Sequence, residues 1–277
     1  MNGDVLVTLL LCLFGFISGI TTALFGFGGG FITVPLLYAL ITLVWGSESE
    51  ASAVAMQIAV ATSTCVMIFS ASLSSRAHYR KGHLNWSIIR PFIIPISLGG
   101  ILGAFIALSV DSEWIRWLFI GYLVITILDC LIRPGFMKTH TEGITPSGGG
   151  VFADIPIGLV IGAVAAFLGV GGSVMTVPLM RRRGATMIQA AAFANPLTLP
   201  MAITGTLTYF YFALTEHVQL GAGFIGMVYI KGALILIVTS WLGIRFASLL
   251  MSYLSDKRHA QSYPLLLLIV LSVMLLT

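Results

Sequence analysis

The sequence predicts an all-α, polytopic integral membrane protein made of two inverted repeats of about five helical segments each, with about eight to ten transmembrane segments. Three observations predict this class. Hydrophobic residues occupy 58% of the 277 positions, whereas charged residues occupy only 9%. A 23-residue segment near the N-terminus recurs in the second half of the chain. Finally, Lys and Arg concentrate in alternate loops, which is typical of a chain that crosses a membrane repeatedly.

The scarcity of charge excludes several other classes of protein. A soluble domain carries roughly 25% charged residues, so 14 Lys and Arg with 10 Asp and Glu are too few to coat one. The same composition excludes intrinsic disorder. The basic residues are scattered in short loops, so the expected partner is the lipid bilayer and not nucleic acid. Three cysteines in separate apolar runs predict helix packing rather than a disulfide framework: Cys12, Cys65 and Cys130.

The recurring segment indicates an internal duplication. An ungapped alignment of 15–37 with 158–180 matches ten of 23 positions, including a shared Thr-Val-Pro-Leu block. Further along, Gln57 aligns with Gln189 and Gly103 with Gly243. A polar tract separates the two copies and is typical of a linker. We therefore predict three parts: a first transmembrane repeat at 1–132, a cytoplasmic linker at 133–154 and a second, inverted repeat at 155–277.

Each glycine block joins two unequal apolar pieces. In the second repeat only Ser173–Met180 follows the glycines before three arginines, and eight helical residues reach about 12 Å. That piece cannot cross roughly 30 Å of hydrocarbon. We therefore expect each glycine turn to lie inside the membrane, as the tip of a broken-helix or re-entrant hairpin. Full-length spans are predicted at 51–75, 91–110, 115–132, 186–214 and 224–250, with a shorter last run at 263–277.

The loops divide into a basic and an acidic group. Four loops hold 11 of the 14 Lys and Arg residues, at 76–90, 133–138, 181–183 and 257–258. The loops between them hold only Arg116 among the cations, and several acids. The positive-inside rule places the basic group in the cytoplasm, with both termini outside. Because five segments is an odd number, the second repeat is then inverted relative to the first.

The glycine tips are the strongest candidate site. Glycine permits a sharp turn, and the helix that follows presents unsatisfied N–H groups and a positive dipole end. Two such ends, brought together by the inverted repeat, make an anion site without a charged side chain. The alternative is tight helix packing, which we favour for Gly15, Gly19, Gly158 and Gly162. The candidate substrate-binding residues here are Gly26, Gly28, Gly29, Gly30 and Thr33, with Gly169, Gly171, Gly172, Ser173 and Thr176.

The doubled block resembles a known family. Gly26-Phe-Gly-Gly-Gly-Phe-Ile-Thr-Val-Pro35 and Gly169-Val-Gly-Gly-Ser-Val-Met-Thr-Val-Pro178 are similar to the TauE/SafE family of sulfite and organosulfonate exporters. The resemblance covers most of the chain, including Tyr79–Trp86 and Leu242–Ala247. It implies transport of small anions such as sulfite, sulfoacetate or other sulfonates. Ser173 departs from the usual third glycine, and its hydroxyl either adds a hydrogen bond or marks a different substrate.

Polar side chains inside apolar segments extend the candidate path. Ser63 and Thr64 lie near the middle of their segment, and the alignment places Asn195, followed by a helix-breaking Pro196, opposite Ser63. Hydroxyl and amide groups suit sulfonate oxygens. The alternative for each is a hydrogen bond within its own helix, and for Gln57 and Gln189 a hydrogen bond between helices.

Charged and titratable residues add little to this path. Lys231 lies in an apolar run and is predicted either to attract anions or to snorkel to the surface. Asp129 and Arg245 are predicted to lie at the interface. The histidines are placed in loops without metal-ligand spacing, so neither a metal nor a cofactor is expected: His78, His83, His140, His217 and His259.

These features predict a secondary transporter, an exporter of small sulfur-containing anions that binds them near the membrane midplane and works by alternating access. The alternative is an anion channel with a glycine-lined filter. An enzyme is not expected, because the chain has no H-E-x-x-H or G-x-S-x-G motif and no paired acids. A purely structural role would leave the duplicated tips without a purpose. A homodimer is a further expectation, and the coupling ion stays open.

Overall fold

The computed structural model describes residues 2–46, 49–133, 135–137, 151–216, 220–250 and 255–276. Within these residues the chain forms eleven α-helices and one two-stranded antiparallel sheet. The elements of the first half are α1 (Asn2–Phe25), α2 (Gly30–Trp45), α3 (Glu50–Ala53), α4 (Ala55–Arg80), α5 (Trp86–Leu108) and α6 (Ser112–Ile132). Those of the second half are α7 (Val151–Leu168), α8 (Ser173–Arg182), α9 (Met187–Thr215), β1 (Phe224–Ile225), β2 (Val228–Tyr229), α10 (Ile230–Leu250) and α11 (Asp256–Leu276).

Seven of the described helices are long and apolar enough to cross a membrane, namely α1, α4, α5, α6, α9, α10 and α11. Two shorter apolar helices, α2 and α7, complete the set. The predicted class of an all-α, polytopic membrane protein is confirmed. The most buried of the seven is α4, because it lies at the centre of the bundle and packs against both α2 and α9.

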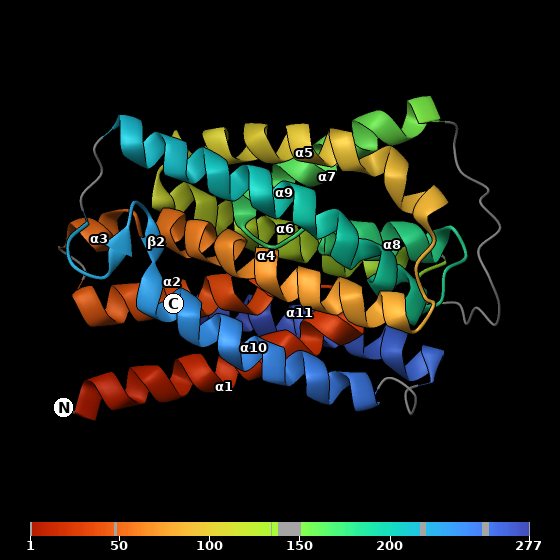
Figure 1. The fold of residues 1–277 in the computed structure, drawn as a ribbon, viewed down its shortest axis with the longest axis horizontal. Helices are drawn as coiled ribbons and strands as arrows, with labels where there is room; N and C mark the ends of the chain where they lie inside the picture. The colour runs from red at the N-terminus through yellow and green to blue at the C-terminus, as the bar shows by residue number, and fades with distance from the viewer. Residues whose placement is uncertain are drawn as a thin grey trace.

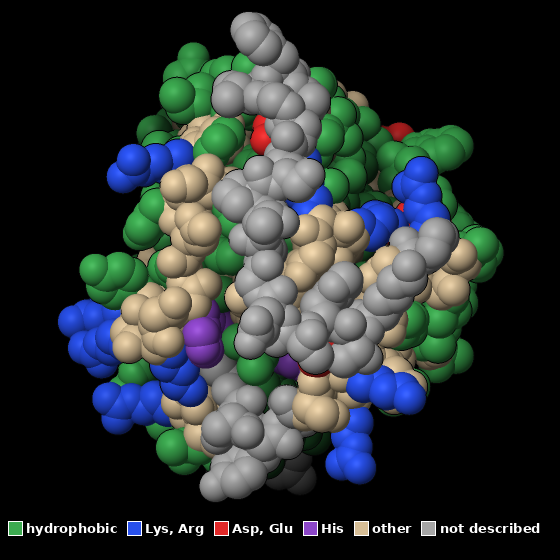
Figure 2. Space-filling view, turned by 90° about the vertical axis from the view of Figure 1, so that its right-hand side faces the viewer, with side chains coloured by type: hydrophobic (Ala, Val, Ile, Leu, Met, Phe, Trp, Pro, Cys, Tyr) green, Lys and Arg blue, Asp and Glu red, His purple; other side chains and the backbone are tan. Residues whose placement is uncertain are grey.

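The long helices lie side by side along the longest axis of the molecule (Figure 1). At one end, on the right of Figure 1, the chain turns between α4 and α5, between α8 and α9, and between α10 and α11. We call this the basic end, because Figure 2, which faces it, shows Lys and Arg side chains around its rim. At the opposite end α1 begins, and the β1–β2 hairpin and α3 are found there (Figure 1).

Both glycine blocks form hairpins inside the bundle. The pair α1 and α2 opens toward the end opposite the basic end, whereas α7 and α8 open toward the basic end (Figure 1). Each hairpin therefore returns to the end from which it started. At the usual rise per residue, the 10 residues of α8 reach about 15 Å, half of a bilayer core. The opposed directions are those that an inverted duplication would produce.

Three predicted boundaries were wrong. The last helix begins at Asp256 and not near 263, so α11 has 21 residues and is long enough to cross. Pro196 does not break its helix, because α9 continues through it to Thr215. Residues 224–229, predicted as helix, form a hairpin. The local cause is Gly226, whose φ of 57° suits a tight turn and not a helix. Helix α7 begins at Val151, within the stretch 133–154 that is predicted as a linker, and residues 138–150 of that stretch lie outside those described.

Helix packing at small residues joins the two halves. A Cβ placed on Gly19 of α1 would lie 2.1 Å from the carbonyl oxygen of Ser240 in α10. In the second half, a Cβ on Gly162 of α7 would lie 2.2 Å from the carbonyl oxygen of Ile96 in α5. The backbones approach this closely only where the side chain is a hydrogen atom. The helix-packing interpretation of these glycines is thus confirmed.

The contacts also correct the sequence alignment. Gly243 faces the carbonyl oxygen of Phe16, and Gly99 faces that of Leu159, which is the counterpart of Phe16 in the duplicated segment. Equivalent contacts therefore pair Gly243 with Gly99 and not with Gly103. The shared Leu-Gly dipeptide misled the alignment by one helical turn, because four residues later on a helix the same face returns.

Replacing Gly162 by alanine is expected to lower the free energy of unfolding by about 1–3 kcal/mol, because the added methyl must push α7 and α5 apart. Thermal unfolding of the purified protein in detergent measures this. The matched control is Gly121→Ala in α6, where a Cβ would meet nothing within 4 Å. Equal melting temperatures for the two variants would contradict the close packing of α5 and α7.

Candidate functional site

The first tip is a run of left-handed residues between two helices. Gly26, Gly28 and Gly29 have φ values of 77°, 66° and 98°, a region that residues with a side chain rarely adopt. Helix α1 ends at Phe25, and α2 begins at Gly30. All of these residues are buried, so the turn lies inside the protein and not in a loop at its surface.

The second tip is built similarly, with one difference. Gly169 and Gly171 have φ values of 66° and 74°, but Gly172 is right-handed with a φ of −66°. Ser173, the position that departs from the family pattern, is the first residue of α8 and is fully buried. Its helical conformation accepts a side chain, and its hydroxyl has no hydrogen-bond partner among the described residues.

The two tips touch each other. A Cβ on Gly30 would lie 2.3 Å from the carbonyl oxygen of Gly169, and one on Gly171 would lie 3.2 Å from that of Phe27. Ser63 of α4 bridges them. Its Oγ lies 3.0 Å from the hydroxyl of Thr33 and donates to the carbonyl oxygen of Gly169 at 2.9 Å. Because Ser63 is the ninth of the 26 residues of α4 and is fully buried, the meeting point lies inside the bundle and not at either end.

Hydroxyl groups hold the tip carbonyls. Ser18 of α1 and Thr33 of α2 donate to the carbonyl oxygen of Gly29 at 2.7 and 2.9 Å. Ser70 of α4 donates to that of Gly28, and Thr176 of α8 to that of Gly172 at 2.7 Å. The acceptors of the turns are thus largely satisfied from inside the protein.

The donors of the turns are not satisfied. Among the described residues, the backbone N–H groups of Gly28, Gly29, Gly171 and Gly172 donate no hydrogen bond, although all four residues are buried. A buried N–H without a partner is rare, because it loses water without gaining another acceptor. Four of them at two touching turns, each followed by a helix N-terminus, form a small donor-rich region suited to an anion.

Asn195 of α9 is fixed beside the first tip. Its Nδ2 donates to the carbonyl oxygens of Thr22 and Ala191 at 3.2 and 3.1 Å and to the hydroxyl of Ser74 at 2.9 Å. These contacts tie α9 to α1 and α4. Its Oδ1 is buried without a partner among the described residues, like the Ser173 hydroxyl.

Other predicted residues lie elsewhere or act locally. Thr64 donates to the carbonyl oxygen of Ala61 in its own helix. Lys231 is exposed in the first turn of α10, beside the β1–β2 hairpin, so the structure does not bring it to the tips. Gln57 donates to the carbonyl oxygen of Val110 at 2.7 Å and links α4 to the turn between α5 and α6, whereas Gln189 forms a capping box at the start of α9. The aligned glutamines thus have different roles.

A chain of aromatic rings, not predicted from the sequence, connects the first tip with the basic end. The ring centroids of Phe27 and Tyr263 are 5.1 Å apart, and those of Tyr263 and Phe136 are 5.3 Å apart. Tyr263 also donates to the carbonyl oxygen of Val174 in α8 at 3.2 Å. All three rings are fully buried. They close the space between the tips and the basic end in this conformation.

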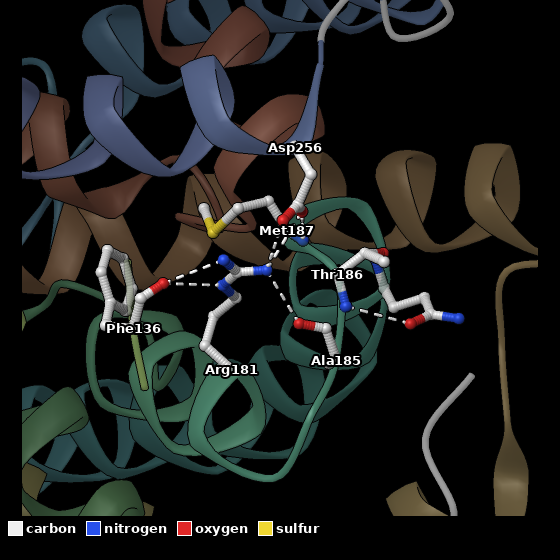
Figure 3. Close-up of polar contacts among 7 residues, drawn as sticks. Phe136, Arg181, Ala185, Thr186, Met187 and Asp256 are labelled. Atoms are coloured by element: carbon white, nitrogen blue, oxygen red, sulfur yellow. Dashed lines mark hydrogen bonds and ion pairs between the residues drawn. The ribbon is translucent and has the colours of Figure 1, made fainter. Parts of the chain in front are cut away.

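Arg181 anchors this closure (Figure 3). Its guanidinium is fully buried, donates to the carbonyl oxygens of Phe136 and Ala185, and pairs with Asp256 at 2.9 Å. Asp256 also accepts the N–H of Met187 at 2.7 Å. One side chain from α8 therefore ties together the segment after α6 and the starts of α9 and α11. The three-arginine run suggested only a cytoplasmic loop, so its position in the sequence did not reveal this buried role.

Two of the histidines also differ from expectation. His78 and His259 lie within α4 and α11 and are buried, rather than in loops. The Nε2 of His78 lies 3.0 Å from the carbonyl oxygen of Ala23, near the end of α1. His83, in the loop after α4, is partly buried beside Lys81, and burial together with the lysine charge lowers its pKa. The described residues contain no group of three or more metal-ligating side chains, while His140 and His217 lie outside them.

Apolar helices around two glycine-tipped hairpins define a multi-pass membrane protein with the discontinuous helices typical of transporters. Comparison with known proteins gives the family. A model described as "Sulfite exporter TauE/SafE" matches residues 11–276, so the chain belongs to the TauE/SafE family of membrane transporters.

Relatives agree with this assignment. The chain is 27% identical over 203 residues to a probable membrane transporter protein of Haemophilus influenzae, a match that covers 73% of each chain. It is 24% identical over 238 residues to a probable membrane transporter protein of Methanocaldococcus jannaschii, covering 85% of each. No solved structure matches. These names indicate membrane transport, which is not an enzymatic activity.

Proposed function

We propose that this protein is a secondary transporter that exports small sulfur-containing anions, such as sulfite or an organosulfonate, and binds them between the two glycine tips. One observation carries the proposal. Four buried backbone N–H groups without partners lie at two turns that touch each other. Sulfite and sulfonates present three oxygens within a small volume, and these oxygens accept such donors. The family description supports the sulfur chemistry.

The charge distribution supports an anion held by dipoles. The tips contain no charged residue, and Lys231 lies apart from them. An isolated charge inside the membrane is expensive, whereas helix N-termini offer a positive potential without that penalty. The Ser173 hydroxyl, buried and unpartnered among the described residues, can donate a further hydrogen bond to the anion. The Asn195 amide oxygen, also buried and unpartnered there, is an acceptor and suits a donor such as water.

Alternating access follows from the two hairpins. They open toward opposite ends of the molecule, as in transporters built from inverted repeats. We propose that the repeats of this chain, 1–132 and 155–277, are related in this way, and that the basic end faces the cytoplasm of a bacterial inner membrane. In this conformation the Phe27–Tyr263–Phe136 chain closes the cytoplasmic side. Export then requires these rings to separate from the tips.

Replacing Gly28 or Gly171 by leucine tests the proposal. A leucine at either position needs an unfavourable positive φ and strikes Thr198 and Met67, so anion binding is expected to fall at least tenfold. Uptake of radiolabelled sulfite, sulfoacetate and taurine into proteoliposomes measures transport. Isothermal calorimetry on the purified variants measures binding.

The matched control is Gly121→Leu, at a helical site with open space. Undiminished anion transport in both tip variants would contradict the site. Saturation of the flux with substrate is expected of a transporter, whereas flux that rises linearly at channel-like rates would favour the anion channel with a glycine-lined filter.

A further inference from the structure

A basic groove lies at the basic end, away from the glycine tips. It has a volume of about 430 Å³ and lies between the last turns of α4 and the end of α10. Four cationic side chains are among the residues that line it: Arg76, Arg80, Lys81 and Arg245. None of the lining residues that the structure describes is acidic.

The arginines of this groove differ from the three consecutive arginines at the end of α8. Arg181, Arg182 and Arg183 each pair with an aspartate, at 2.9, 2.7 and 2.7 Å, and these pairs tie helices together. In the described part of the chain, Arg76, Arg80 and Arg245 form no ion pair with an acid. The first three arginines have a structural role, whereas the groove arginines have charge available for a ligand.

Exposed aromatic side chains are found on the two helices that form the groove, α4 and α10. Trp241, 37% exposed, lies under Arg245, whose guanidinium carbon is 4.5 Å from a ring centroid of the indole. Phe246 and Phe69, on the adjoining surfaces of α10 and α4, are both about half exposed. Trp241 is the twelfth of the 21 residues of α10 and Arg245 the sixteenth, so the indole lies about one helical turn deeper in the transmembrane helix than the guanidinium. The ligand therefore has an anionic part beside an apolar part.

The duplication gives each groove arginine an equivalent position in the other copy, and none of these equivalent positions is basic. By the correspondence of Ser63 with Asn195, Arg76 and Arg80 have Thr208 and Phe212 as counterparts. By the matching contacts of Gly243 and Gly99, Arg245 corresponds to Ile101. The shared transport fold therefore does not require the charges. They occur in the groove between α4 and α10, at the basic end, and not at the equivalent positions of α9 and α5.

We propose that this groove binds the phosphate of an anionic phospholipid, such as phosphatidylglycerol, with its acyl chains against α4 and α10. Guanidinium groups match phosphate oxygens in pairs, and basic pockets between transmembrane helices hold anionic head groups at the cytoplasmic leaflet. The lysine takes part from a fixed position, since Lys81 Nζ already donates to the carbonyl oxygen of Ser248 at 2.6 Å. The bound lipid joins α4 of the first half to α10 of the second.

The test compares the wild type with Arg76→Ala/Arg245→Ala. Native mass spectrometry counts the phosphatidylglycerol molecules retained, and thermal unfolding is measured in nanodiscs of phosphatidylglycerol and of phosphatidylcholine. The double variant is expected to bind phosphatidylglycerol about 30-fold more weakly, from the contribution of each basic side chain near an anionic lipid. It is also expected to lose the extra thermal stability that anionic lipid provides, with unchanged unfolding in phosphatidylcholine.

The control is Arg90→Ala/Arg258→Ala, which removes two exposed arginines that do not line the groove. If the groove variant does not fold, Arg76→Gln and Arg245→Gln, which keep the side chain as far as the δ carbon and remove the charge, are measured singly. Equal lipid retention by the groove and control variants would overturn the proposal. So would equal stabilisation of the wild type by inorganic phosphate in neutral detergent, since the ligand would then be a soluble anion. Because the experiment measures lipid binding and not transport, its outcome does not depend on whether the proposed transport function is correct.

Discussion

Replacing Gly30 by alanine is expected to abolish anion transport and to lower the free energy of unfolding by about 1–3 kcal/mol. The added methyl would lie 2.3 Å from the carbonyl oxygen of Gly169 and 2.8 Å from the Ser63 hydroxyl. The carbonyl belongs to the backbone of the opposite tip and cannot rotate away. The two tips must therefore separate, which moves their N–H groups out of reach of one small anion.

Transport into proteoliposomes and melting temperature are measured together. The matched control is Gly205→Ala in α9, a buried helical position where the nearest atoms would be 3.8 Å from the new Cβ. That variant is expected to keep transport within about twofold of the wild type, because ordinary van der Waals contact displaces nothing. Full transport by Gly30→Ala would show that contact between the tips is unnecessary.

Arg181→Ala is expected to destabilise the protein by about 3–5 kcal/mol. The substitution leaves Asp256 partly buried without its cation and removes the donors to the carbonyl oxygens of Phe136 and Ala185. Thermal unfolding and the yield of monodisperse protein in detergent report the loss. Arg133→Ala is the control, because the Arg133 side chain is 70% exposed and its pair with Asp129 contributes less than about 1 kcal/mol.

A second variant separates packing from charge. Arg181→Met with Asp256→Leu removes both partners of the buried pair, and replacing a whole buried pair by apolar groups is often neutral. The double variant is expected to recover part of the stability lost by Arg181→Ala. If it is less stable than Arg181→Ala, then the aspartate acts mainly through its hydrogen bond to the Met187 N–H and not through the arginine.

Part of the candidate site could be predicted from the sequence. The doubled glycine block and the eight residues after it predicted a turn inside the membrane, because φ and helix length are local properties. The partners of the turns were not predictable in the same way. Ser18 and Ser70 are two of several hydroxyl side chains in α1 and α4. Nothing in the sequence around them distinguishes them from hydroxyls that bond within their own helix.

For the charged residues too, the sequence predicted one property and the structure decided another. The distribution of Lys and Arg among the loops predicted which loops share an end of the molecule, because the end at which a loop lies depends only on the number of membrane crossings before it. It did not distinguish Arg181, buried on Asp256, from Arg76, which lines a groove. Adjacent residues of a helix point in directions about 100° apart, so the neighbouring helices decide which arginine is enclosed.

The sequence by itself determined the class of protein, the duplication and the family, because composition, repetition and glycine spacing are properties of the chain. It also located the tips, since only glycine accepts their left-handed conformation without strain. Only the tertiary structure decided that Gly30 meets Gly169, that Ser63 bridges them, and that Lys231 lies apart. Such contacts join residues more than a hundred positions apart, and they depend on how whole helices pack rather than on any local preference of the chain.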